Sequence, residues 1–113
     1  GFAAFKRGQQ HELLLARGFQ AALAHVPAHL SRPDLVVLDP PRAGAHAKVC
    51  RQIAQAGAKD VIYVACDPTS LARDTATLIS LGYRLSDIRA YDIYPMTHHV
   101  ETVALFTRKD FSR

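Results

Sequence analysis

Short apolar runs alternate with amphipathic segments along the centre of the chain. Leu35 to Leu38 is a short β-rich run, and the Pro40-Pro41 pair must end this strand because proline cannot donate to a sheet ladder. A helix is predicted from about Ala45 to Ala56, where apolar residues recur every three or four positions, and Gly57 marks its end. Val61 to Ala65 has the continuous apolar pattern of a strand covered on both faces.

The pattern then predicts a second helix and two more strands. Asp67 suits the N-cap and Pro68 the first helical position, and Gly82 marks the end of the helix. The apolar face of this helix is predicted to comprise three residues, namely Leu71, Leu78 and Ile79. A strand centred on Ile88 to Ile93 and another over Val100 to Thr107 follow. The loop between them is too short for a helical crossover, so we expect antiparallel neighbours.

The first third of the chain has a weaker pattern. Glu12 to Ala16 is predicted to be a strand, Phe19 to His25 a helical turn or two, and Pro27 to Pro33 a loop. Alternation of strands and helices along the rest predicts an α/β fold: a mostly parallel sheet with an antiparallel final strand and helices packed on it.

Three residues with reactive or charged side chains are expected at one edge of this sheet. Asp39 ends one parallel strand and Cys66 ends the next, while Glu101 opens the last, antiparallel strand, whose beginning lies at the same edge. Ligands in such folds bind beyond the carboxyl ends of the strands. This coincidence of positions is the strongest indication of function that the residues alone provide.

Each of these residues has a functional and a structural interpretation. Cys66 directly precedes a helix N-terminus, which favours an anion and hence a nucleophilic thiolate, but a small buried residue ending a strand fits equally. Asp39 could bind a hydroxyl, an amine or a cation, or cap a turn. Arg42 could steer a phosphate or a developing oxyanion, or be a solvated surface residue. Glu101 could be a catalytic carboxylate, or a charge that protects an edge strand from aggregation. Cys50 lies on the apolar helical face, which indicates core packing.

Composition narrows the class of protein. The chain has 113 residues, enough for one domain, and a net charge of +4 that is compatible with a polyanionic partner such as RNA. Its two cysteines lack disulfide or metal-site spacing, as expected in a reducing cytoplasm, and we predict no bound metal. No apolar stretch is long enough to span a membrane, and none near the start resembles a signal peptide. The oligomeric state stays open.

The chain contains neither a P-loop nor a G-x-G-x-x-G motif, so a complete cofactor site is not predicted from its residues. Two alternatives to a cofactor-dependent enzyme remain. Cys66 with His98 or His99 and Glu101 could form a hydrolase triad in which the imidazole activates the thiol. The chain could also be a non-catalytic RNA-binding module.

Three ordered blocks of the sequence closely resemble the RNA uracil-5 methyltransferases, which make 5-methyluridine in tRNA or rRNA with S-adenosylmethionine. The blocks are Asp39-Pro-Pro-Arg-Ala-Gly44, Tyr63-Val-Ala-Cys-Asp-Pro-Thr-Ser-Leu-Ala-Arg-Asp74 and Asp92-Ile-Tyr-Pro-Met-Thr-His-His-Val-Glu101. The resemblance covers Leu35 to Arg108. It implies a Rossmann-like class I methyltransferase sheet and an RNA substrate.

The resemblance also implies roles for individual residues. Asp39 would contact S-adenosylmethionine, Cys66 would be the nucleophile and Glu101 the general base, with Arg42 stabilising the enolate oxygen or contacting a phosphate. The family's first glycine-containing cofactor motif and its upstream RNA-binding region are absent from residues 1–113. We therefore expect the C-terminal part of a cytoplasmic methyltransferase catalytic domain, inactive alone, with Gly1 marking the boundary of a cut piece.

Overall fold

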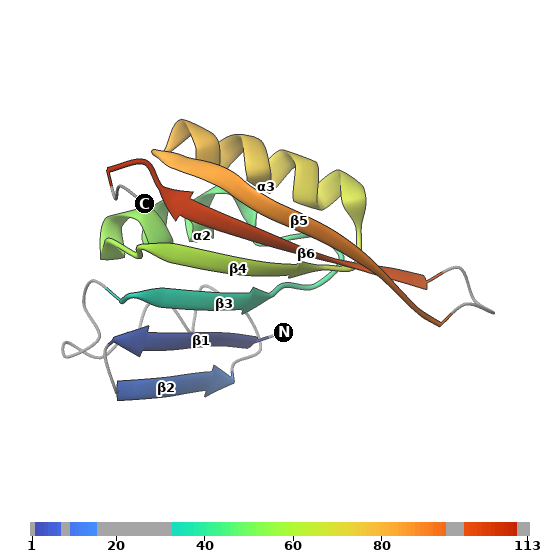
Figure 1. Cartoon of the computed structure of the whole chain (residues 1–113), viewed down its shortest axis with the longest axis horizontal. Coiled ribbons are helices and arrows are strands. Elements are labelled where there is room, and N and C mark those ends of the chain that lie inside the picture. The colour runs from blue at the N-terminus through green and yellow to red at the C-terminus, as the bar shows by residue number, and fades with distance from the viewer. Residues whose placement is uncertain (1, 8–9, 16–32, 95–98, 111–113) are drawn as a thin grey trace.

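The computed structural model describes residues 2–7, 10–15, 33–94 and 99–110, which form six strands and two helices. The strands are β1 (Phe2–Arg7), β2 (Gln10–Leu15), β3 (Leu35–Asp39), β4 (Asp60–Ala65), β5 (Tyr83–Tyr94) and β6 (His99–Arg108). The helices are α2 (His46–Ala56) and α3 (Pro68–Ser80). All six strands join one sheet in the order β2-β1-β3-β4-β6-β5 (Figure 1).

The α/β class and the antiparallel final strand are confirmed, but the sheet is mixed rather than mostly parallel. Only β3 and β4 pair in parallel among the described strands. β6 lies between β4 and β5 and is antiparallel to both. β4 and β5 run in the same direction but do not pair with each other, because β6 separates them. The predicted antiparallel pairing of the last two strands is thus correct.

The ends of both helices follow from local sequence. The backbone of Gly57 is left-handed, with φ of 78°, and its N–H donates to the oxygens of Ile53 and Ala54, which ends α2 where predicted. Asp67 caps α3 by accepting a hydrogen bond from the Ser70 N–H at 2.9 Å, and Pro68 occupies the first turn. Both predicted caps are confirmed.

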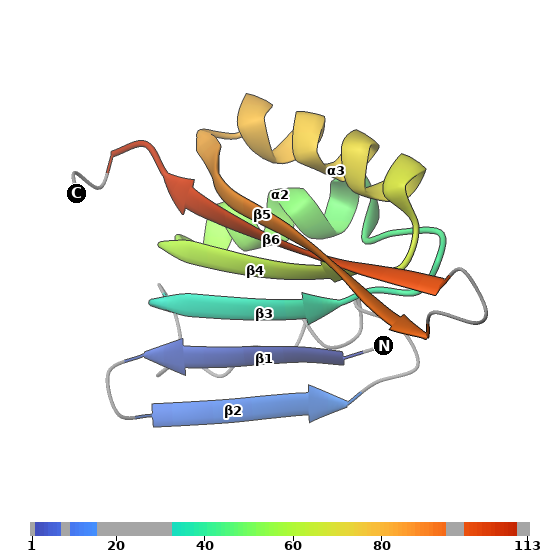
Figure 2. The same ribbon diagram turned by 45° about the vertical axis from the view of Figure 1, so that its right-hand side comes forward.

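One hydrophobic core joins the helices to a single face of the sheet. Alternate residues of β3, β4 and β6 are buried against α2 and α3, together with Tyr83 of β5; the strand residues are Val36, Leu38, Val61, Tyr63, Ala65, Ala104 and Phe106. Figure 2 shows the helices on this side of the sheet. Cys50 belongs to this core, as predicted, whereas Ile79 is 43% exposed and does not lie on the buried face of α3.

The N-terminal predictions are met in part. The predicted strand near Glu12 exists as β2, although it begins earlier, at Gln10, and β1 was not predicted. The predicted helical turns over Phe19 to His25 lie outside the described residues, as does the predicted loop from Pro27 apart from Pro33.

Candidate active site

The sheet register brings the predicted nucleophile and base positions together. Ala65, the last residue of β4, pairs with Thr102 of β6, so Cys66 follows and Glu101 precedes this pair at the same edge. In the parallel pairing, Leu38 lies beside Tyr63, and Asp39 is therefore also near the carboxyl end of β4. Asp39, Cys66 and Glu101 share one edge of the sheet, as the sequence predicts.

The pleat of the strands decides which face Asp39 and Glu101 take. Successive side chains of a strand point to opposite faces. Leu38 is buried under the helices, and Thr102 shares its face of β6 with the buried Ala104, two residues further on. Asp39 and Glu101 are the next residues along their strands, so their side chains lie on the opposite face of the sheet. Because α2 and α3 do not cover that face, the two carboxylates point away from the hydrophobic core.

Cys66 lies between the end of β4 and the start of α3. Its side chain is partly exposed, which excludes a fully buried residue that only ends a strand. The adjacent Asp67 accepts a hydrogen bond from the Ser70 N–H, and the Ser70 hydroxyl oxygen also lies 2.9 Å from the same carboxylate oxygen; these contacts lower the pKa of the Asp67 carboxyl. The positive charges of Arg42 and Arg73 add to this lowering. Both arginines therefore act electrostatically on the residue beside Cys66.

Side chains of α3 bind main-chain atoms of the loop from Pro40 to Ala45. The Ser70 hydroxyl donates to the Arg42 carbonyl oxygen at 2.6 Å, and Nη2 of Arg73 donates to the Ala43 carbonyl oxygen at 2.6 Å. These contacts join two of the three sequence blocks through main-chain atoms. The loop that carries Arg42 is held against the helix that Cys66 precedes.

A buried polar group lies beneath this loop. Asp74 is completely buried, and its Oδ2 accepts hydrogen bonds from the Ala45 N–H at 2.8 Å and from the Tyr63 hydroxyl at 2.5 Å. Arg73 lies 3.4 Å from the other carboxylate oxygen. Burial and the neighbouring Asp74 raise the pKa of the Tyr63 hydroxyl well above its usual value, so the phenol remains a hydrogen-bond donor.

The loop backbone takes an uncommon shape. Gly44 has φ of 89° and His46 has φ of 73°, and a positive φ at a residue with a side chain is uncommon. A Cβ on Gly44 would lie 2.5 Å from Nη2 of Arg73 and 2.7 Å from Oδ2 of Asp74, so glycine permits the close approach. Such conformations persist only where surrounding contacts determine them.

The structure bears on several of the sequence-based interpretations. β6 as a whole is flanked by β4 and β5, but its pairing with β4 ends at Thr102 and Glu101 pairs with Tyr91 of β5, so the interpretation of Glu101 as a charge that protects an edge stays a prediction. Arg42 is exposed, as its surface interpretation requires, yet its charge acts on Asp67. The hydrolase alternative needs an imidazole, but His98 and the side chain of His99 lie outside what the structure describes.

Sequence reasoning missed Tyr63 and Asp74 as members of the site. The signal was present, because Asp74 lies three residues after Leu71 and four before Leu78, on the predicted apolar face of α3. A carboxylate there must be buried, and a buried carboxylate requires partners. Tyr63 stands in an apolar strand and resembles ordinary core packing.

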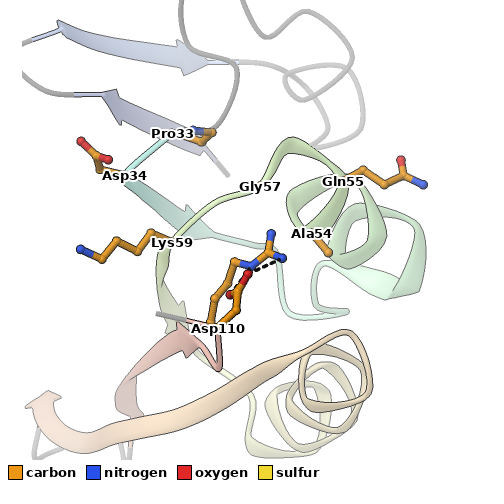
Figure 3. Close-up of a pocket in the computed structure, with 8 residues that line it drawn as sticks. Pro33, Asp34, Ala54, Gln55, Gly57, Lys59 and Asp110 are labelled. Carbon is orange, nitrogen blue, oxygen red and sulfur yellow. Dashed lines mark hydrogen bonds and ion pairs between the residues drawn. The ribbon is translucent and has the colours of Figure 1, made fainter. Parts of the chain in front are cut away.

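A cavity lined by described residues is remote from this edge. It has a volume of about 290 Å³ and lies where β3 and β4 begin and β6 ends. Figure 3 shows the residues that line it. Its lining comprises Pro33, Asp34, Ala54, Gln55, Gly57, Lys59, Arg108 and Asp110. Arg108 and Asp110 form an ion pair at 3.1 Å. The cavity is at the opposite end of the strands from Asp39 and Cys66.

Within the ranges that the structure describes, no group of three or more His, Cys, Asp or Glu residues is arranged to hold a metal ion. Neither described helix is long and apolar enough to cross a membrane. The predicted absence of a metal and the predicted cytoplasmic location stay predictions.

Comparison with known proteins identifies the family. The family model described as tRNA (Uracil-5-)-methyltransferase matches residues 17–109. The chain belongs to this family. The resemblance carried by the three sequence blocks is thereby confirmed. An RNA methyltransferase of Bifidobacterium longum (strain NCC 2705) is 81% identical over 86 residues, which cover 76% of this chain and 20% of that protein.

Two further relatives of this methyltransferase family member have more specific descriptions. The 23S rRNA (uracil(1939)-C(5))-methyltransferase of Pseudomonas savastanoi pv. phaseolicola is 55% identical over 92 residues, covering 78% of this chain and 20% of the relative. The crystal structure of Pyrococcus abyssi tRNA (uracil-54, C5)-methyltransferase in complex with S-adenosyl-L-homocysteine matches with a TM-score of 0.60 and 39% identity, covering 66% of this chain and 18% of that one. The chain spans about a fifth of the length of these relatives.

Proposed function

We propose that this chain carries the nucleophile and the general base of an enzyme that methylates C5 of a uridine in rRNA or tRNA. The observation that supports this most directly is the pairing of Ala65 with Thr102, which brings the positions of Cys66 and Glu101 to one edge. S-adenosylmethionine would supply the methyl group, whose bond to sulfur breaks as its bond to C5 forms, and S-adenosyl-L-homocysteine would leave. The membership of the chain in a methyltransferase family supports the same reaction.

Cys66 would begin the reaction by adding to C6 of the uracil ring. Uracil C5 is a poor nucleophile, but a bond between Sγ of Cys66 and C6 moves the ring electrons into an enolate that is nucleophilic at C5. Arg42, on the exposed loop beside α3, would stabilise the enolate oxygen or contact a phosphate of the RNA. The target base must leave its stack to reach both groups.

Glu101 would complete the reaction by removing the C5 proton after methyl transfer. The electron pair of the C5–H bond then re-forms the C5–C6 double bond, and the thiolate of Cys66 leaves C6. The position of Glu101 on the face that α2 and α3 leave uncovered is compatible with access to a base bound there. A carboxylate is a suitable acceptor for this proton.

Asp39 is the described residue best suited to contact S-adenosylmethionine. It lies at the carboxyl end of β3, where ligands of open α/β sheets bind, and Pro40 directs the chain away after it. A carboxylate there fits the hydroxyl and amino donors of a nucleoside or amino acid. One carboxylate is only part of a pocket, so we propose that residues 1–113 alone bind the cofactor weakly and do not turn over, as the C-terminal part of a catalytic domain.

Trapping with RNA that contains 5-fluorouridine tests the proposal, because fluorine cannot be removed from C5 as a proton can. The complete protein that includes this chain should form a denaturation-resistant adduct, and mass spectrometry should locate it on Cys66. Cys50→Ala is the matched control and should keep the adduct, whereas Cys66→Ala should lose it. Glu101→Gln should accumulate an adduct with ordinary uridine.

Three results would contradict parts of the proposal. Methylation that survives Cys66→Ala would favour a non-catalytic role for this chain. Absence of any adduct in the complete protein with S-adenosylmethionine present would remove the covalent mechanism and reopen the hydrolase alternative. Tight cofactor binding by the 113-residue chain in a calorimetric titration would show that the cofactor site is already complete.

A further inference from the structure

We infer that Tyr63 and Asp74 form a buried clamp that positions the Arg42 loop beside Cys66, which makes them positioning residues for the reaction; this inference rests on the proposed function. Neither side chain faces the proposed substrate site, since both lie in the core between the sheet and α3. The clamp would act through the main chain of the loop from Pro40 to Ala45.

The burial of Asp74 is the first reason for this inference. A buried carboxylate is tolerated only when hydrogen bonds and opposite charge compensate for its lost hydration. Here the compensation comes from the Tyr63 hydroxyl, the Ala45 N–H and the Arg73 guanidinium. One of these donors belongs to the loop itself, so the loop cannot move away without leaving a buried charge incompletely bonded.

The convergence of contacts on a short segment is the second reason. Ser70 holds the Arg42 carbonyl, Arg73 holds the Ala43 carbonyl, and Asp74 holds the Ala45 N–H. The hydroxyl of Tyr63 also lies 3.3 Å from the Ala45 nitrogen. Since Arg42 lies at one end of this fastened segment, its backbone position is determined by α3.

The third reason is that α3, the helix to which the loop is bonded, begins beside Cys66. α3 begins directly after Cys66 and Asp67, and the charge of Arg42 acts on Asp67. Bonding of the loop to α3 therefore fixes the backbone of Arg42 relative to Cys66. A displacement of about 1 Å in a reacting arrangement can lower a rate by about a hundredfold.

Tyr63→Phe is the test variant, because it removes the hydroxyl and keeps the ring that fills the core. Tyr83→Phe is the matched control: Tyr83 is also fully buried, and its hydroxyl donates to the Ala58 carbonyl at 2.5 Å, away from the loop. In the complete protein, Tyr63→Phe should lower the kcat for RNA methylation about tenfold or more with little change in KM. Tyr83→Phe should leave kcat unchanged.

A double-mutant cycle with Arg42→Gln separates positioning from a general loss of stability. If the clamp acts through Arg42, adding Tyr63→Phe to Arg42→Gln should lower kcat by less than about twofold further. Asp74→Asn keeps a hydrogen-bond acceptor and should retain more activity than Asp74→Ala. Full additivity of Tyr63→Phe with Arg42→Gln, or equal losses in Tyr63→Phe and Tyr83→Phe, would overturn the inference.

Amide hydrogen exchange of the complete protein provides a readout that does not depend on catalysis. Tyr63→Phe should speed exchange at Ala45 selectively, and Tyr83→Phe should not. Unchanged exchange at Ala45 would refute the clamp even if the complete protein methylates RNA. Selective loss of protection in a protein that forms no uridine adduct would instead retain the clamp and reject the proposed function.

Discussion

Gly44→Ala should destabilise the protein far more than the same change at Gly82. Both glycines have a positive φ, 89° at Gly44 and 101° at Gly82, so each substitution carries the cost of a left-handed backbone, about 1–2 kcal/mol. A Cβ on Gly82 meets no atom within 4 Å, and this variant therefore measures the backbone cost alone.

The surroundings of Gly44 add a second cost. Its Cβ would lie 2.5 Å from Nη2 of Arg73, 2.7 Å from Oδ2 of Asp74 and 3.0 Å from Cβ of Ser70. The guanidinium of Arg73 can move away, but Asp74 is buried and bonded to Tyr63 and Ala45. Disturbing hydrogen bonds to a charged group costs about 1.5–3 kcal/mol. We therefore expect Gly44→Ala to lower the free energy of unfolding by about 2.5–5 kcal/mol in total.

Urea denaturation of the two variants, followed by circular dichroism, measures this difference. With a denaturant dependence of about 2 kcal/mol per molar urea, the midpoint of Gly44→Ala should fall about 1 M below that of Gly82→Ala. Equal midpoints would refute the reasoning, because they would show that nothing rigid opposes a side chain at Gly44. The packing of the loop on Asp74 would then have to be abandoned.

Two further predictions follow from the pKa shifts. The hydrogen bonds to Asp67 in the folded state lower the pKa of its carboxyl, so the stabilising effect of the ionised group is present above the usual aspartate range and is lost as pH falls through the native pKa. Asp67→Ala should thus lower the thermal midpoint at pH 7, and by an amount that shrinks as pH falls below about 3.8, with Asp67→Asn keeping part of the cap. Burial raises the pKa of Cys50 to about 12, so iodoacetamide at pH 8 should label Cys66 and not Cys50 in the folded chain, and should label both cysteines in urea. The raised pKa also means that the contribution of Cys50 to stability should disappear as pH rises from about 9 towards 12, and a Cys50→Ala variant should lack this pH dependence. Labelling of Cys50 in the folded state, or an Asp67→Ala effect independent of pH, would contradict these predictions.

The local elements of the fold could be predicted from sequence because their signals are local. Gly57 and Asp67 set helix ends through their own backbone and side-chain preferences, and the apolar run of β4 is distinctive by itself. The pairing of strands is not a local property. The alternation of strands and helices is typical of parallel pairing, and it therefore predicts a mostly parallel sheet. The place of β6 beside β4 depends instead on which edge of the sheet is open after β3 and β4 pair.

The candidate site divides in the same way. Asp39, Cys66 and Glu101 could be predicted at one edge, since strand direction alone decides at which end of the sheet a residue lies. Tyr63 and Asp74 could not be matched to each other from the sequence, because their contact depends on how α3 sits on β4. A buried carboxylate indicates that a partner exists without indicating which residue it is.

The insertion of β6 between β4 and β5 also has a consequence for folding. Cys66 and Glu101 are far apart along the chain, and they become neighbours only when β6, which pairs with the preceding strand β5, also pairs with β4. Contacts of such long sequence separation form late, because the entropy of closing the intervening chain is lost before the contacts stabilise it. In a partly folded molecule the Cys66 thiol would thus be present without the carboxylate proposed as the general base, and the candidate site would be assembled only as the sheet closes.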